Sequence, residues 1–512
     1  MDGLFVPLAD AVGASVDQVK LISCLLIAYP LGSVFIRIPS SHPALKHLFS
    51  VAITLLFFFP VLKLYAGFFQ LLGSVLATYY LTRYYQGPMM PWVVFAVVMG
   101  HLTVNHVIRV IYQFSYETFE VTGPQMVLTM KLTTFAWNVH DGQRPAADLD
   151  KWQMAKRVTK FPTLLEFLGY SFYFPGMLVG PYLDYSDYMN LINETVFKTL
   201  AVKGKSGRNI PAGRKRVAYR KMVTGLLYLG AFIVGGGTWN YSISLTPWFA
   251  EQSLLYRIAI YQICGVFERM KYYAIWTLTE GASIKTGLGF TGLSPSGKTL
   301  WKGAANVDVL AIEFPSNFKV LLDAWNMKTN VWLRECVYKR VTPKGKKPGF
   351  RSSMITFTTS AFWHGIASGY YLAFLTGGFI TTIGRLARAN IRPLVLEAPG
   401  TQPSLAKRAY DVVGTIITTL LLNYAASPFM LLSFTDSFTT WARLGFYGHV
   451  IIGAAMAFFY AGGAKFCRSM HSKQQQAKMT RSPSSVGTPV NEKQFMVPPS
   501  FDQIVPPRAQ LG

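Results

Sequence analysis

Apolar runs recur along the chain from residue 19 to residue 466, and no long polar interval separates them. Each run approaches the length of about 20 residues that a helix needs to cross a bilayer. The pattern therefore predicts an all-α polytopic membrane protein with one transmembrane body. We expect about eleven spans, at residues 19–38, 47–64, 67–82, 91–112, 124–137, 163–183, 222–241, 253–269, 354–385, 410–432 and 446–466.

Several of these runs contain glycine or proline, as residues 163–183 do at Pro175 and Gly176. Helix breakers at bilayer depth are tolerated where neighbouring helices or a water-filled cavity satisfy the freed backbone groups. We therefore expect short, tilted or re-entrant segments around an internal cavity. The strongest candidate for a broken span is residues 354–385, because Gly365 and Gly369 lie near its middle.

The segments outside the spans divide the chain into three parts. Residues 1–18 form an N-terminal segment, residues 19–466 the transmembrane domain, and residues 467–512 a tail rich in Gln, Ser and Pro that we expect to be disordered. Residues 270–325 are amphipathic, which suits helices and loops on the membrane surface. The first apolar run is long enough to be a retained helix rather than a cleaved signal, so the endoplasmic reticulum is the expected residence.

Composition and charge support a membrane protein and argue against a nucleic-acid partner. Hydrophobic residues make up 51% of the chain and charged residues only 14%, which is too apolar for an ordinary soluble enzyme. Three segments, residues 195–221, 328–351 and 465–512, carry +21 of the formal net charge of +25. Basic segments beside apolar spans mark the cytosolic side and face anionic lipids, so the C-terminal tail is expected in the cytosol. A phosphate-bearing cytosolic ligand is the alternative partner.

His364 is the clearest candidate for chemistry. It lies in the sequence SAFWHG within an apolar segment, beside Trp363 and a glycine that allows close approach by another group. An imidazole titrates near neutrality and can take a proton from a hydroxyl, so His364 is a candidate general base. The alternative is a structural histidine that hydrogen-bonds between helices.

Asn326 is the second candidate, in the sequence WNMKTNVWLRECVYKR that begins at Trp325. Its amide can donate a hydrogen bond to a carbonyl oxygen that gathers charge during acyl transfer. The alternative is a helix cap or turn residue. The cations that follow could bind the phosphates of a nucleotide-bearing donor or simply form a solvated loop: Lys339, Arg340, Lys344, Lys346 and Lys347.

His101, Asn105 and Arg109 recur at intervals of four, with His106 beside them. On a helix these positions share one face, which therefore either lines a tunnel or bonds neighbouring helices. The four cysteines lie far apart without metal-ligand spacing, so neither a disulfide framework nor a metal site is expected.

The segments at residues 325–340 and 360–365, followed by Gly369-Tyr370-Tyr371, resemble the membrane-bound O-acyltransferase family. GPYLDYSDY at residues 180–188 and WNVHDG at residues 137–142 look like its lysophospholipid acyltransferase branch as found in fungi. The resemblance covers roughly residues 20–465. It implies a helical bundle around a tunnel, with His364 as the catalytic histidine and Asn326 as its companion.

The resemblance also implies the reaction. Acyl-CoA would be a co-substrate, with no cofactor and no metal, and a lysophospholipid would receive the acyl chain on its free hydroxyl. We expect substrate contacts from Trp325, Trp363, the five cations and the His101, Asn105 and Arg109 stripe. Alternatives are another acceptor, namely a sterol, diacylglycerol or protein, and, from another class, a lipid transporter or scramblase. The oligomeric state stays open.

Overall fold

The structure is a computed structural model that describes residues 2–114, 119–198, 210–343, 345–346, 349–397 and 400–481. Within these residues the chain is helical almost throughout, which confirms the expected all-α class. The first half contains α1 (Asp2–Val12), α2 (Val16–Phe35), α3 (Pro43–Leu56), the π-helix η1 (Phe57–Val61), α4 (Tyr65–Tyr84), α5 (Met90–Ile111), α6 (Thr122–Gly142), η2 (Ala146–Asp148), α7 (Lys151–Lys156), α8 (Leu164–Ser171), α9 (Tyr185–Ile192), η3 (Thr195–Phe197), α10 (Arg214–Gly235), η4 (Tyr241–Leu245) and α11 (Pro247–Glu251).

The second half begins with the longest helix in the described part of the chain, α12, and includes a short antiparallel hairpin. Its elements are α12 (Leu254–Thr286), β1 (Gly292–Leu293), β2 (Thr299–Leu300), α13 (Val309–Glu313), α14 (Phe318–Ala324), α15 (Met327–Leu333), the π-helix η5 (Arg334–Tyr338), α16 (Phe350–His364), α17 (Ser368–Asn390), α18 (Arg392–Val395), α19 (Leu405–Leu431), α20 (Phe434–Arg443), α21 (Tyr447–Phe458), η6 (Phe459–Gly463) and α22 (Ala464–Arg481).

Local sequence signals explain where several helices begin. α2, α7 and α8 each start with a capping box, in which the first side chain accepts from a backbone N–H three residues on and a glutamine or glutamate returns the bond. The capping residues are Ser15, Asp150 and Thr163.

Six stretches of described helix are long and apolar enough to cross a bilayer, so the chain is a multi-pass membrane protein. The remaining expected spans coincide with helices that are shorter or more polar, and the number of about eleven stays a prediction. The six stretches are residues 16–35, 43–61, 90–111, 214–235, 405–431 and 447–476.

Residues 163–183 do not form the continuous span that we expected. α8 ends at Ser171, and the chain then runs through turns to Asp184 with most side chains buried. Glycine and proline stop the helix, and neighbours satisfy the freed carbonyls: Lys131 donates to Tyr170 and Ser171, and Thr54 donates to Phe172. Hydrogen bonds from neighbouring helices thus replace those within a helix.

The expected break within residues 354–385 is confirmed. α16 ends at His364 and α17 begins at Ser368, so Gly365 lies in the turn between them. That these two helices form a re-entrant segment stays a prediction.

Two other expectations need correction. Residues 270–286 do not lie on the surface, because they continue α12 and are almost all buried from Tyr273 onward. Residues 467–481 are helical, whereas we expected a tail without structure from residue 467. Lys and Gln favour a helix once the preceding span has nucleated it. Residues 482–512 lie outside the described residues.

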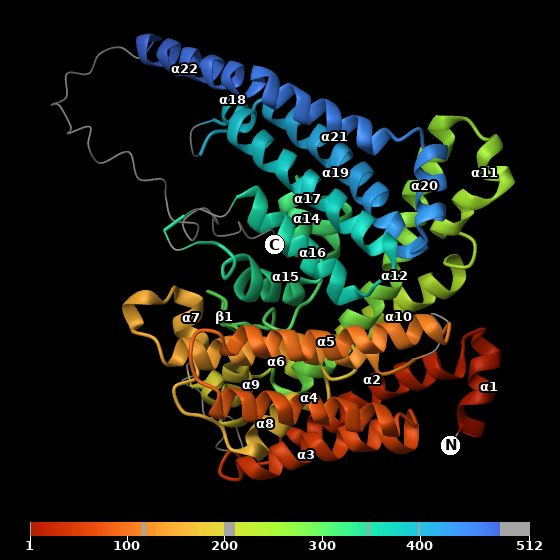
Figure 1. Cartoon of the computed structure of the whole chain (residues 1–512), viewed down its shortest axis with the longest axis vertical. Helices are drawn as coiled ribbons and strands as arrows, with labels where there is room; N and C mark the ends of the chain where they lie inside the picture. The colour runs from red at the N-terminus through yellow and green to blue at the C-terminus, as the bar shows by residue number, and fades with distance from the viewer. Residues whose placement is uncertain are drawn as a thin grey trace.

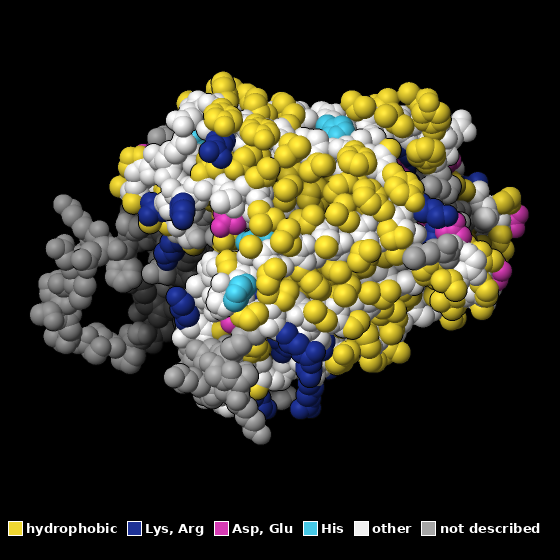
Figure 2. Space-filling view, turned by 90° about the horizontal axis from the view of Figure 1, so that it is seen from below, with side chains coloured by type: hydrophobic (Ala, Val, Ile, Leu, Met, Phe, Trp, Pro, Cys, Tyr) yellow, Lys and Arg dark blue, Asp and Glu magenta, His cyan; other side chains and the backbone are white. Residues whose placement is uncertain are grey.

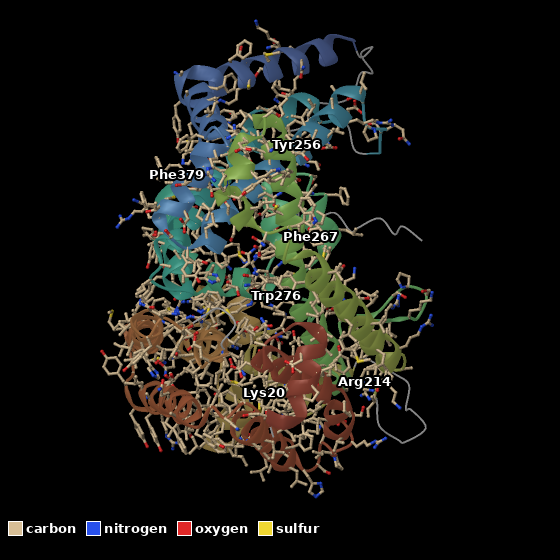
Figure 3. All side chains as sticks on the ribbon, turned by 90° about the vertical axis from the view of Figure 1, so that its right-hand side faces the viewer. Lys20, Arg214, Tyr256, Phe267, Trp276 and Phe379 are labelled. Carbon is tan, nitrogen blue, oxygen red and sulfur yellow. The ribbon has the colours of Figure 1, made fainter. Side chains whose placement is uncertain are left out.

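The helices form two stacked halves in Figure 1, with α2 to α6 and α8 in the lower half and α16 to α22 in the upper half. α12, about 50 Å long, connects them. Figure 3 shows it descending past Tyr256, Phe267 and Trp276 toward α2. α5 and α6 lie at the top of the lower half, directly beneath α15 and α16 (Figure 1).

The lower face of the molecule is broadly apolar, and its Lys and Arg side chains lie toward the margins (Figure 2). Such a band between charged margins suits a surface in contact with lipid acyl chains.

Candidate active site

The His364 ring lies in an aromatic enclosure at the C-terminus of α16. Neither of its ring nitrogens has a hydrogen-bond partner among the described residues, so the interhelical bond of the structural alternative is not made. An imidazole in apolar surroundings with both nitrogens free can bind a substrate hydroxyl. The enclosing rings, with their centroid distances, are Trp363 (4.6 Å), Phe429 (4.8 Å), Phe374 (5.2 Å) and Tyr370 (5.6 Å).

Glycines shape the turn that follows His364. Gly365 has φ +143°, a conformation that residues with a β-carbon rarely adopt, and a β-carbon there would lie 3.1 Å from the Tyr370 ring. Gly369 donates its N–H to the carbonyl oxygen of Leu432, 2.7 Å away, and a β-carbon on it would overlap the carbonyl oxygen of Pro428. The turn therefore brings α17 against the end of α19, which carries Phe429.

Asn326 lies between α14 and α15 with a left-handed backbone, at φ +42°. It occupies the N-cap position of α15, but its side chain does not make the capping bond. Its Oδ1 accepts instead from Asn306 Nδ2 at 3.1 Å and from Thr329 Oγ1 at 2.8 Å. Because two donors fix the oxygen, Nδ2 is directed elsewhere, and it has no partner in the described part of the chain.

α6 brings the two motifs together. The Trp363 indole Nε1 donates to the carbonyl oxygen of Met126 at 3.0 Å, and Thr329 Oγ1 lies 3.3 Å from Met130 Sδ. Met126 and Met130 are about one turn, or 6 Å, apart along the helix. The Trp332 and Trp363 rings are 5.6 Å apart, in one apolar cluster with residues of α5 and α6. The residues beside Asn326 and His364 thus contact neighbouring turns of one helix.

Trp325, expected to bind substrate, packs on α12. Its ring lies 5.1 Å from that of Trp276 and 5.5 Å from that of Tyr272. A substrate contact from Trp325 therefore stays a prediction, and packing is the role that the geometry gives it.

Lys339 and Arg340 are engaged in ion pairs. Arg340 binds both oxygens of Asp141 at 2.9 and 2.5 Å, and its guanidinium lies 4.2 Å from the centre of the Trp137 ring. Lys339 binds Asp150 at 2.7 Å and Glu335 at 2.6 Å. Burial raises the pKa of Asp150, but the hydrogen bond and charge of Lys339, together with backbone N–H groups at the start of α7, outweigh it, so this pKa lies below its ordinary value. Arg340 thus ties the end of α6 to the segment after η5, and Lys339 ties Asp150, at the start of α7, to Glu335 of η5.

Of the other predicted cations in this segment, Lys346 is exposed, and Lys344 and Lys347 lie outside the described residues. Among the cations that the structure describes, Lys339 and Arg340 are therefore paired with acids, whereas Lys346 is exposed.

The His101, Asn105 and Arg109 stripe bonds α5 to its neighbours, which was one of the two alternatives. Asn105 Nδ2 donates to Gln70 of α4 at 2.9 Å and to Gln125 of α6 at 2.7 Å. His101 Nδ1 lies 2.7 Å from Ser74 Oγ, and Arg109 pairs with Glu120 at 2.7 Å. The polar face thus holds helices together.

His106 was noted in the sequence only as the neighbour of this stripe. Its Nε2 lies 3.1 Å from the carbonyl oxygen of Trp363, the residue before His364. The available signal was an ionisable residue within an apolar helix, but the sequence did not show which element it contacts.

A cavity of about 200 Å³ lies beside the Asn326 motif. Lys328 lines it, two residues after Asn326, and donates through Nζ to the carbonyl oxygen of Gly303 at 2.6 Å. Burial lowers the pKa of Lys328, and the carboxylates of Asp187 and Asp184 oppose that shift. The remaining walls come from residues 181–183, 187, 190–191, 196, 287–291 and 303–304.

Comparison with known proteins bears on residues throughout this site. The model of the membrane-bound O-acyltransferase family matches residues 48–427. A lysophospholipid acyltransferase of Schizosaccharomyces pombe is 42% identical over 87% of this chain and 87% of its own length. One from Saccharomyces cerevisiae is 38% identical over 86% of this chain and 73% of its own. Membrane-bound glycerophospholipid O-acyltransferase 2 of Gallus gallus is 31% identical over 87% of this chain and 86% of its own length.

Proposed function

Because the chain belongs to the membrane-bound O-acyltransferase family, we propose that it transfers an acyl chain from acyl-CoA to the free hydroxyl of a lysophospholipid. The observation that carries the proposal is the meeting of the Asn326 and His364 segments on α6. Within the described part of the chain, neither the His364 ring nitrogens nor Asn326 Nδ2 has a hydrogen-bond partner. The names of the similar proteins support the acceptor class. Membership of an acyltransferase family argues against the transporter alternative.

In the proposed reaction a ring nitrogen of His364 accepts the proton of the lysophospholipid hydroxyl. The hydroxyl oxygen forms a bond to the thioester carbon while the carbon–sulfur bond breaks, and the CoA sulfur leaves with the proton that His364 returns. The step needs one base and no redox partner, and we propose that neither a metal nor a cofactor takes part.

Asn326 would stabilise the charge that develops on the thioester oxygen. Its Nδ2 is free to donate, and its orientation is set by Asn306 and Thr329 before substrate arrives. A donor fixed in advance costs no reorganisation during the reaction, which is the basis of oxyanion stabilisation.

We place the polar part of the donor near the cavity beside Lys328 and the cations of residues 328–351. The cavity adjoins the Asn326 motif, and a buried ammonium can bind a phosphate or a carbonyl group. The lysophospholipid would enter laterally from the bilayer, so the two substrates reach His364 from different directions.

The test is acyl transfer by microsomes that contain this chain, supplied with radiolabelled acyl-CoA and a panel of lysophospholipid headgroups. His364→Ala should abolish transfer while the protein still accumulates in the membrane, because no other base stands at that position. His449→Ala, which removes a histidine bonded to Tyr424 elsewhere in the fold, is the control and should retain transfer.

Transfer at the wild-type rate by His364→Ala would reject the mechanism. Acylation of sterol, diacylglycerol or a protein, with none of lysophospholipid, would reject the proposed acceptor and leave the chemistry standing.

We also propose residence in the endoplasmic reticulum with the C-terminus in the cytosol, since the basic segments favour the cytosolic side. An epitope tag after residue 512 should then be cleaved by protease added to sealed microsomes. Full protection of the tag would contradict the assignment.

A further inference from the structure

His106 is a buried histidine on α5, only 6% exposed, whose one hydrogen bond among the described residues goes to α16. Its Nε2 lies 3.1 Å from the backbone carbonyl oxygen of Trp363. A carbonyl oxygen only accepts, so Nε2 carries the proton and donates it. This bond links the helix of the polar stripe to the helix that ends at the proposed base.

The Trp363 carbonyl belongs to the last turn of α16. The helix ends at His364, so this carbonyl has no N–H donor within its own helix. A buried carbonyl without a donor is costly, and His106 supplies the donor from another element. The bond therefore fixes the end of α16 where Gly365 allows the chain to turn away.

The side chain of Trp363 is held as well. Its indole donates to the Met126 carbonyl on α6 and packs on Trp332. Backbone and side chain of Trp363 are thus anchored to α5 and α6 respectively, which Figure 1 shows lying beneath α16. His364 is the next residue, so the direction of its side chain follows from this anchoring.

The His106 ring also lies against the turn itself. A β-carbon on Gly365 would be 3.6 Å from His106 Nδ1. The histidine ring therefore lies close to the residues on both sides of His364, without a bond to the His364 ring.

We propose that His106 is a positioning residue that holds the His364 backbone in place for acyl transfer. The inference rests on the proposed function for its kinetic consequence. A displacement of about 1 Å in a reacting group can cost about a hundredfold in rate, so a single backbone hydrogen bond is enough to matter.

The experiment compares His106→Leu and His106→Gln with the full-length wild type, purified into nanodiscs. Leucine removes the donor, whereas glutamine places an N–H₂ group the same number of bonds from the backbone as Nε2. His47→Leu is the matched control: His47 is 2% exposed and bonds Tyr188 Oη at 2.8 Å, on α9 rather than α16.

We expect His106→Leu to lower kcat by about tenfold to a hundredfold with little change in the KM for acyl-CoA. His106→Gln should recover most of that loss. His47→Leu should lower the thermal unfolding temperature at least as much as His106→Leu while keeping kcat close to the wild-type value.

A second measurement does not depend on turnover. The rate at which diethyl pyrocarbonate modifies His364, followed by mass spectrometry, should change in His106→Leu and stay near the wild-type rate in His106→Gln and His47→Leu. Equal effects of the two leucine variants on kcat and on His364 modification would overturn the positioning role, as would failure of glutamine to recover activity. Absence of acyl transfer by the wild type would count against the proposed function alone, because the modification assay would still decide on His106.

Discussion

Two features fix Asn326: two hydrogen-bond donors hold its side-chain amide oxygen, and its backbone has a conformation that few residue types adopt. Its φ of +42° is left-handed, which asparagine and glycine tolerate better than residues such as alanine. Its Oδ1 is fixed by Asn306 and Thr329, so Nδ2 has one direction available. Asparagine at this position therefore both tolerates the left-handed backbone and supplies a directed N–H donor.

Asn326→Gly should lower kcat by about a hundredfold or more, because it removes the donor proposed for the thioester oxygen while keeping the backbone conformation. Asn326→Ala should lower kcat to a similar extent and also lower the free energy of unfolding, since alanine at positive φ costs about 1 kcal/mol. The measurements are steady-state kinetics and thermal unfolding of purified variants.

The glycine variant separates the two effects. A loss of activity in Asn326→Ala that Asn326→Gly does not share would assign the residue to the backbone turn. An effect confined to the KM for acyl-CoA would make Asn326 a substrate-positioning residue instead.

At the scale of elements, α6 acts as the common support of the site. Successive turns of this helix contact Trp363, Thr329, Trp332 and Arg340: Met126 and Met130 hold the first two, and Thr133 Oγ1 accepts from the Trp332 indole at 2.9 Å. Asp141 binds Arg340 at its far end. The segments carrying the two proposed functional residues are thus aligned by one rigid helix.

Arg340→Met should destabilise the protein by about 1 to 3 kcal/mol, because it removes the bidentate partner of the buried Asp141 carboxylate and leaves the longer contact from Arg144, at 3.4 Å. The double variant Arg340→Met with Asp141→Asn should recover much of that stability. The expected KM for acyl-CoA stays near the wild-type value in both. Chemical or thermal unfolding in detergent measures the stability, and acyl-transfer kinetics measure the KM for acyl-CoA.

The opposite result would place Arg340 in the acyl-CoA site. If Arg340→Met raised the KM for acyl-CoA and left unfolding unchanged, the guanidinium would belong to the donor site rather than to the α6–η5 junction.

At the scale of the whole molecule, the apolar lower face lies between charged margins (Figure 2). The basic segments carry most of the net charge of +25. Such cations attract an anionic donor over a range of about 8 to 10 Å in ordinary buffers, the Debye length. Because Lys339 and Arg340 are paired with acids, we assign this attraction to the other cations of the segment, of which Lys346 is exposed.

Neutralising Lys344, Lys346 and Lys347 together as glutamines should raise the KM for acyl-CoA and weaken its dependence on salt, while the KM for a zwitterionic lysophospholipid changes little. The check is a donor titration at two salt concentrations, after confirming that the C-terminus stays on its native side. Replacing Lys465, Lys473 and Lys478 by glutamine is a control of equal charge change. If the KM for acyl-CoA is the same in the wild type and in the variant of Lys344, Lys346 and Lys347, these cations have a role in topology only.

Several features of the fold could be predicted because they depend on neighbouring residues. The apolar runs predicted a helical membrane protein, and six of them form helices long enough to cross a bilayer. Gly365 predicted the break between α16 and α17, because the backbone conformation of a glycine, here φ +143°, depends on that residue itself rather than on distant partners. The roles of His364 and Asn326 were inferred from residue chemistry and family resemblance, and both stay predictions until the variants are measured.

Tertiary structure decided what depends on residues far apart in the chain. The break after α8 is stable because Lys131 and Thr54 satisfy its carbonyls, and α12 continues past residue 269 because neighbours bury it. The ion pair between Arg340 and Asp141 joins residues 199 positions apart, and the bond from His106 to Trp363 joins residues 257 apart. Hydropathy and helix breakers act within a few residues, whereas a buried hydrogen bond or ion pair exists only after packing has chosen the partner.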